Sequence, residues 1–149
     1  MYPSTTLRLI KIRINNLDIV DTPGIIDKDS IVNYVNDLDL KKITPTKEIK
    51  PKSCQINKEG SIVIDKYARI DYKTKEKNSI IIYTSNILNI RFNSVKKEYL
   101  KELKEHKFVI ETKSDIVIPG LGFIKIIKPL TLILYTLDKV KPYIRNSLI

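Results

Sequence analysis

The residues best suited to chemistry are four consecutive positions, Asp21-Thr22-Pro23-Gly24, which follow a short apolar run. An apolar strand of this kind brings the carboxylate of Asp21 to the edge of a sheet, where it can hold the Mg²⁺ ion of a bound nucleotide through water. Gly24 allows its backbone N–H to approach a γ-phosphate closely, and Pro23 stiffens that approach. The pattern predicts a phosphate-sensing turn whose following segment, 25–35, is released when the γ-phosphate is lost.

A threonine upstream strengthens this interpretation. GTPases of the translation-factor class use a threonine shortly before the preceding strand to sense Mg²⁺ and the γ-phosphate; here Thr6 is the better candidate and Thr5 the alternative. The competing hypothesis is a threonine-rich strand edge beside an unrelated Asp-Thr-Pro-Gly turn. Neither a Gly-x-x-x-x-Gly-Lys-[Ser/Thr] phosphate loop nor an Asn-Lys-x-Asp guanine-reading motif occurs in the sequence. We therefore expect the chain to contribute only part of a nucleotide site.

Two elements must position these residues. A β-branched, roughly alternating run at 6–14, the turn residues Asn15-Asn16 and a return strand at 17–20 predict a β-hairpin. A short helix should follow, with Asp29 or Ser30 as its N-cap. Its buried face would carry Ile31, Tyr34 and Val35.

Beyond residue 40 the pattern changes. The apolar periodicity fades between 38 and 51, which favours a basic linker or entry strand and a domain boundary. Short strands separated by turn residues follow, as in a small sheet or barrel. The predicted strands are 53–56, 61–64, 68–72, 79–84, 87–92, 108–111, 115–118, 122–127, 131–135 and 143–145, with one helix at 94–105 capped by Ser94. The fold class is therefore α+β and mostly β: residues 1–40 carry a hairpin and a helix, and residues 41–149 form a small antiparallel β-rich domain with one helix.

Charge divides the chain in the same place. The net charge is +10, but residues 1–40 hold four basic residues and six aspartates, which leaves 23 basic and 11 acidic residues for the remainder. A strongly basic domain usually has a polyanionic partner, and counterion release then supplies much of the affinity. The alternative is compositional bias, since Lys, Asn and Ile are all abundant. The cations predicted to contact RNA are Lys47, Lys50, Lys52, Lys66, Arg69, Lys73, Lys75, Lys77 and Arg91, with Tyr67, Tyr72, Tyr83 and Phe92 as possible stacking faces.

At this point the sequence resembles the YqeH family of circularly permuted GTPases. The resemblance extends over essentially all 149 residues. The pattern Asp-Ile-Val-x-x-Gly-Leu-Gly followed by an aromatic residue is distinctive, because it lies outside the generic GTPase signatures. The segments that carry the resemblance are Pro3-Ser4-Thr5-Thr6-Leu7, Asp21-Thr22-Pro23-Gly24-Ile25-Ile26, Lys47-Glu48-Ile49-Lys50-Pro51, Ala68-Arg69-Ile70-Asp71-Tyr72, Ser114-Asp115-Ile116-Val117-Ile118-Pro119-Gly120-Leu121-Gly122-Phe123 and Arg145-Asn146-Ser147-Leu148-Ile149.

The resemblance implies more than the residues do. In that family the guanine-reading motifs precede the phosphate loop, so this chain would begin just after the phosphate loop, at switch I, and run to the native C-terminus. Residues 1–40 would be the end of a P-loop G domain, and residues 41–149 would be similar to tryptophan-attenuation RNA-binding proteins. GTP and Mg²⁺ would bind the intact protein through Thr5, Thr6, Asp21, Thr22, Pro23 and Gly24, with Thr6 and Asp21 serving the metal and Ile25 at the usual glutamine position.

The function implied is GTP hydrolysis in small-ribosomal-subunit assembly, with the small subunit or its RNA and the missing G-domain half as partners. Whether the chain is an enzyme by itself stays open, and we expect neither tight GTP binding nor hydrolysis from it alone. The alternative is a stand-alone RNA-binding or protein-interaction β-domain without nucleotide chemistry. No membrane partner is expected, since no apolar run is long enough to span a bilayer, and the expected compartment is the bacterial cytoplasm or, alternatively, an organelle matrix.

Three residues outside these motifs have structural interpretations. His106 should cap the end of the predicted helix. Cys54, the one cysteine, excludes an internal disulfide and a multi-cysteine zinc site and is expected to be a small buried side chain. Gly120 and Gly122 should permit a bulge or tight bend between two strands.

Overall fold

The computed structural model describes residues 10–14, 17–21, 28–93 and 103–148. Its first element is an antiparallel hairpin of β1 (Ile10–Ile14) and β2 (Leu17–Asp21), in which Ile12 lies opposite Ile19. The predicted hairpin is confirmed over these strands, and the 6–9 part of the prediction lies outside the described residues. The alternation of β-branched residues explains the pairing.

Two short helical elements follow: the 3₁₀ turn η2 (Ile31–Asn33) and the helix α1 (Asp37–Ile43). The predicted cap at Ser30 is confirmed, because its side chain accepts a hydrogen bond from the backbone N–H of Val32. Ile31 is buried as predicted, but Tyr34 is 38% exposed and was wrongly placed on the buried face. The reason is that η2 stops after three residues, so Tyr34 caps its end.

The helix α1 corrects the start of the basic linker or entry strand predicted at 38–51, because residues 38–43 are helical. Asn36 caps it by accepting a hydrogen bond from the N–H of Asp39 at 2.8 Å. Acidic residues occupy its first turn and lysines its last, which suits the helix dipole. With Leu38 76% exposed, hydrophobic spacing gave little signal, whereas the cap and the charges specify the helix.

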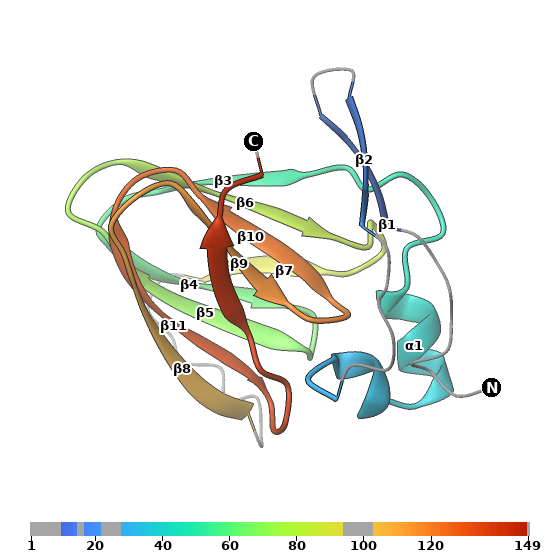
Figure 1. Ribbon diagram of the computed structural model, residues 1–149. Coiled ribbons are helices and arrows are strands. Elements are labelled where there is room, and N and C mark those ends of the chain that lie inside the picture. Colours follow the sequence, from blue (N-terminus) through green and yellow to red (C-terminus); the bar gives the residue numbers. More distant parts are fainter. Residues whose placement is uncertain (1–9, 15–16, 22–27, 94–102, 149) are drawn as a thin grey trace.

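The rest of the molecule is a β-sandwich of two five-stranded antiparallel sheets (Figure 1). The first sheet has the order β12 (Tyr143–Asn146), β9 (Ser114–Ile118), β10 (Gly122–Ile126), β6 (Asn78–Thr84) and β3 (Lys52–Ile56). The second has the order β7 (Ile90–Asn93), β4 (Glu59–Ile64), β5 (Ala68–Lys73), β11 (Leu130–Leu137) and β8 (Leu103–Ile110). The predicted fold class, mostly β and antiparallel, is confirmed.

The core lies between the two sheets and is rich in isoleucine. Ile70 and Leu134 face it from the second sheet, and Ile80 and Ile124 from the first, all fully buried. Period-two alternation puts these side chains on one face of each strand. Each fully buried residue of this size contributes about 1.5–3 kcal/mol relative to an exposed one. Ile31 and Ile43 belong to the same core, so α1 and η2 pack on the sandwich.

Two predicted elements need correction. The predicted helix at 94–105 lies largely outside the described residues, but its last three positions open β8, which pairs with β11 along its whole length. His106 therefore lies in a strand, with Nε2 3.0 Å from the hydroxyl of Thr136, and caps no helix. The strand predicted at 87–92 begins at Ile90 instead. Leu88 is buried but belongs to the β6–β7 loop. In the sequence, a buried apolar residue in a loop is indistinguishable from a residue of a strand.

The β9–β10 turn contains the predicted bend. Gly120 has φ +82° and Gly122 has φ +148°, in the region that favours glycine. A Cβ atom on Gly122 would overlap the carbonyl oxygen of Tyr83, and one on Gly120 would overlap the hydroxyl of Ser30. The two glycines thus let the turn approach both a neighbouring strand and the segment before η2.

Candidate functional site

The predicted nucleotide residues lie at the start of the chain. Asp21 is the last residue of β2 and is paired with Ile10 of β1. The remaining positions lie outside the described residues: Thr5, Thr6, Thr22, Pro23, Gly24 and Ile25. Their roles toward GTP and Mg²⁺ stay predictions.

Residues 28–43, which follow the predicted phosphate-sensing turn, are joined to one end of the sandwich. The backbone N–H of Ile31 donates to the carbonyl of Pro119 at 2.9 Å, and that of Lys141 donates to the carbonyl of Asp29 at 3.3 Å. These bonds connect η2 to the β9–β10 turn and to the segment before β12. We call this end of the sandwich, covered by η2 and α1, the helix end.

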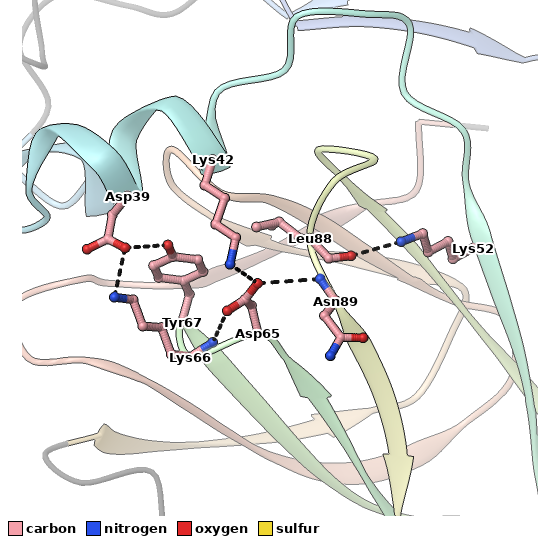
Figure 2. A network of polar contacts seen from close by, with 8 residues as sticks. All are labelled: Asp39, Lys42, Lys52, Asp65, Lys66, Tyr67, Leu88 and Asn89. Atoms are coloured by element: carbon pink, nitrogen blue, oxygen red, sulfur yellow. Dashed lines mark hydrogen bonds and ion pairs between the residues drawn. The ribbon is translucent and has the colours of Figure 1, made fainter.

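Side chains of α1 extend the junction (Figure 2). Asp39 accepts a hydrogen bond from the hydroxyl of Tyr67 at 2.7 Å and forms an ion pair with Lys66 at 2.8 Å. Burial by itself would raise the pKa of Asp39, but the bonds from Lys66 and Tyr67 and the charge of Lys66 lower it below its usual value. Burial, followed by the bond to Asp39, raises the pKa of Tyr67. The network therefore favours ionised Asp39.

A second carboxylate completes the network. Asp65, in the β4–β5 turn, pairs with Lys42 of α1 at 2.8 Å and accepts a hydrogen bond from the N–H of Asn89 (Figure 2). Burial would raise the pKa of Asp65, but these bonds and the charge of Lys42 lower it. Both acids are mostly shielded, with side chains 13% and 14% exposed. The network attaches α1 to the β4–β5 turn, and Asp65 links that turn to Asn89 of the β6–β7 loop.

The β9–β10 hairpin, which carries the distinctive motif, links further parts of the chain. Asp115 is fully buried, and its Oδ2 accepts from Arg145 at 3.4 Å and from the N–H of Leu148 at 3.1 Å. Its Oδ1 has no hydrogen-bond partner within the described ranges. Phe123 stacks on Tyr83 with ring centroids 4.4 Å apart, and the Arg145 guanidinium lies 4.9 Å from the Phe123 ring. The motif thus holds the end of the chain against the first sheet.

The structure separates the predicted RNA-contacting cations. Lys47 and Lys50 are exposed before β3, Lys73 and Lys75 are exposed at the far end of β5, and Arg91 is exposed on β7. Lys66 forms an ion pair with Asp39. Lys52 is half-buried and donates to the carbonyl of Leu88 at 3.0 Å. The nine predicted cations therefore do not form one surface.

Arg69 is a residue whose prediction needs revision. It is 6% exposed, its Nε lies 2.9 Å from Asp71 Oδ1, and its Nη2 lies 3.1 Å from Asp71 Oδ2. The guanidinium also lies 5.7 Å from the ring of Tyr135. This pairing neutralises a buried charge, and we leave Arg69 out of the exposed set.

The predicted stacking residues are mostly internal. Tyr67 and Tyr83 are buried, and Tyr72 packs partly buried against the core. Of the four, Phe92 alone is exposed, at 53%. Cys54, expected to be buried, is partly buried and packs against the core, and burial raises the pKa of its thiol.

Sequence reasoning named Lys73, Lys75 and Lys77 but missed the lysines that lie with them at the end of the sandwich opposite α1. Four loops meet there: β3–β4, β5–β6, β8–β9 and β10–β11 (Figure 1, left). We call this surface the lysine end; its exposed cations are Lys58, Lys73, Lys75, Lys77, Lys113 and Lys128. Antiparallel pairing returns these four loops, each with a lysine, to the same end. Turn lysines alone give no signal for the grouping, since Lys66, Lys139 and Lys141 occupy turns at the helix end.

A metal site and a membrane-spanning helix are two further features to consider. Within the described residues, no group of three or more His, Cys, Asp or Glu side chains is arranged to hold a metal ion. Among the helices described, none is long and apolar enough to cross a membrane.

Comparison with known proteins gives one informative relative. No family model matches the chain. A protein of Bacillus subtilis (strain 168) named "Uncharacterized protein YqeH" is 32% identical over 148 aligned residues, covering 84% of this chain. The chain is a distant homologue of part of YqeH. It spans 40% of the length of YqeH, so the resemblance seen in the sequence is confirmed for that part, and the activity of the whole protein is a matter for proposal.

Proposed function

We propose that this chain is the carboxy-terminal part of a ribosome-assembly GTPase and that its β-sandwich is an RNA-binding module acting on the small ribosomal subunit. The observation that carries the proposal is the homology to YqeH over most of the chain. The succession of β2, Asp21 and a downstream segment bound to the sandwich supports it.

In this proposal the two parts of the chain have different roles. Thr6 and Asp21 serve the Mg²⁺ of a GTP molecule whose phosphates and guanine are held by the missing G-domain half. Gly24 senses the γ-phosphate, with Thr5, Thr22 and Pro23 beside it. The sandwich, with its surplus of lysine, supplies affinity for ribosomal RNA.

The test is a binding titration of the full chain against small-subunit ribosomal RNA and an unrelated RNA of equal length, at several salt concentrations. Tighter binding of the ribosomal RNA, with affinity that falls steeply as salt rises, is the expected result. Weak and indiscriminate binding with a shallow salt dependence would contradict it, and would favour the alternative of a β-domain whose partner is a protein.

A further inference from the structure

The lysine end has a fixed arrangement, although its residues come from loops far apart in the sequence. The N–H of Thr74 donates to the carbonyl of Lys58 at 2.7 Å. Asn78 donates from its side chain to the carbonyl of Lys128 at 2.8 Å and accepts from the N–H of Lys128 at 3.0 Å. The β3–β4, β5–β6 and β10–β11 loops are thereby tied together, so their lysines project from one backbone platform.

The positive charge of this platform is only partly neutralised. Its six exposed lysines face three exposed acids, Glu59, Glu76 and Glu111. In the described part of the chain, the ion pair at this end is Lys128 with Glu76, at a long 3.9 Å and well exposed, so it contributes little. An anionic partner would therefore meet lysines that need not first give up strong internal pairs.

The helix end differs in what surrounds its charges. Lys42 and Lys66 pair there with Asp65 and Asp39, and Lys28, Lys41, Lys139 and Lys141 are exposed. That end also carries the exposed hydrophobic side chains Tyr34, Leu38 and Ile87, which the four loops of the lysine end lack.

The chemistry of the loops indicates which polyanion fits. The four loops at 57–59, 74–77, 111–113 and 127–129 contain no aromatic residue, so they offer no stacking faces for bases. None of the large exposed hydrophobic side chains lies in these loops, although a protein interface normally has an apolar centre. Charge spread over several loops without either feature suits contacts to a phosphate backbone.

We propose that the lysine end is the surface through which the chain grips the phosphate backbone of RNA, and that the helix end, joined to the GTPase segment, stays free of it. This inference rests on the proposed RNA-binding function and adds its location. The lysine end and the predicted nucleotide-responsive segment then lie at opposite ends of one sandwich.

The experiment compares two triple variants of the full chain in the salt-dependent titration with small-subunit ribosomal RNA. The first is Lys73→Gln, Lys75→Gln, Lys77→Gln at the lysine end. The matched control is Lys28→Gln, Lys41→Gln, Lys141→Gln at the helix end, which also removes three exposed positive charges. We expect the first variant to raise Kd about 10-fold or more and to reduce the slope of log K against log salt by about 2, since each lost phosphate contact removes about 0.7–0.9. The control should change Kd less than about 3-fold.

A second lysine-end variant, Lys58→Gln, Lys113→Gln, Lys128→Gln, should show the same loss of RNA affinity. An unchanged urea-unfolding curve for each variant would show that the loss of affinity does not come from a folding defect. If the lysine-end variants and the control lose equal RNA affinity, or the control loses more, the proposed location is wrong and the proposed function still stands. Failure of the unaltered chain to bind the RNA would overturn the function itself. Competition by polyglutamate as effective as by RNA would assign the surface to an acidic protein and overturn the inference.

Discussion

At the scale of single residues, the β9–β10 hairpin is the most constrained place in the described structure. Its glycines leave room for Tyr83 on one side and Ser30 on the other, and Asp115 in the same hairpin holds the backbone of Leu148. The distinctive motif of the sequence therefore has a structural explanation: it brings the segment before η2, the first sheet and the end of the chain together. A ligand is not needed to account for it.

We predict that Gly122→Ala destabilises the protein by about 2 kcal/mol or more, because alanine at φ +148° is strained and its Cβ would overlap the carbonyl oxygen of Tyr83. Urea unfolding measures the difference. Gly60→Ala is the control, since its Cβ would meet only the hydroxyl end of the Tyr72 side chain, which can move, and its φ lies outside the positive region. Equal losses in the two variants would show that the backbone argument is wrong.

At the scale of elements, α1 and η2 matter more than their lengths suggest. The seven-residue helix α1 contacts the β4–β5 turn through Asp39 and Lys42, and Ile31 and Ile43 enter the core. The predicted domain boundary at residue 40 falls inside α1 and stays a prediction. If residues 1–40 belong to a G domain, its last part is built into the neighbouring sandwich.

The two carboxylates predict an acid-sensitive junction. Both pKa values are lowered in the folded chain, so the stabilisation is present above the unfolded value of about 3.9 and is lost as pH falls through the lower folded values. The double variant Asp39→Asn, Asp65→Asn should unfold more easily at pH 7 by about 1–2 kcal/mol, from two weakened charge-assisted bonds. The gap between variant and wild type, measured by urea unfolding, should narrow below about pH 4. A gap that stays constant down to pH 2 would contradict this assignment.

At the scale of the whole molecule, the chain has two ends with different chemistry. The helix end pairs Lys42 and Lys66 with mostly shielded carboxylates and carries exposed hydrophobic side chains, whereas the lysine end presents lysines without hydrophobic neighbours in its loops.

We predict that the chain by itself shows no saturable binding of a fluorescent GTP analogue at micromolar concentration, because the phosphate loop and the guanine-reading motif are absent from its sequence. Fluorescence anisotropy with a complete P-loop GTPase as positive control measures this. Micromolar affinity that is abolished by Asp21→Asn would contradict the prediction and show that the chain forms a nucleotide site of its own.

The sequence by itself determined the features that depend on neighbours along the chain. Alternating β-branched residues predicted nearly every strand. Ser30 predicted the cap, and the pair Gly120 and Gly122 predicted the bend. Each of these features follows from a local steric or hydrogen-bonding preference. Asp21 at the end of β2 followed from the same local pattern.

Only the tertiary structure decided which charged residues are available. Arg69 and Lys75 look equally basic in the sequence, yet cross-strand packing buries the first beside Asp71 and leaves the second in solvent. Lys58 and Lys128 are 70 positions apart and lie at the same end only because antiparallel pairing returns their loops there, where each bonds to the β5–β6 segment. Charge and propensity are properties of residues, but burial, pairing and the gathering of lysines are set by long-range strand pairing, and these decide where a partner can bind.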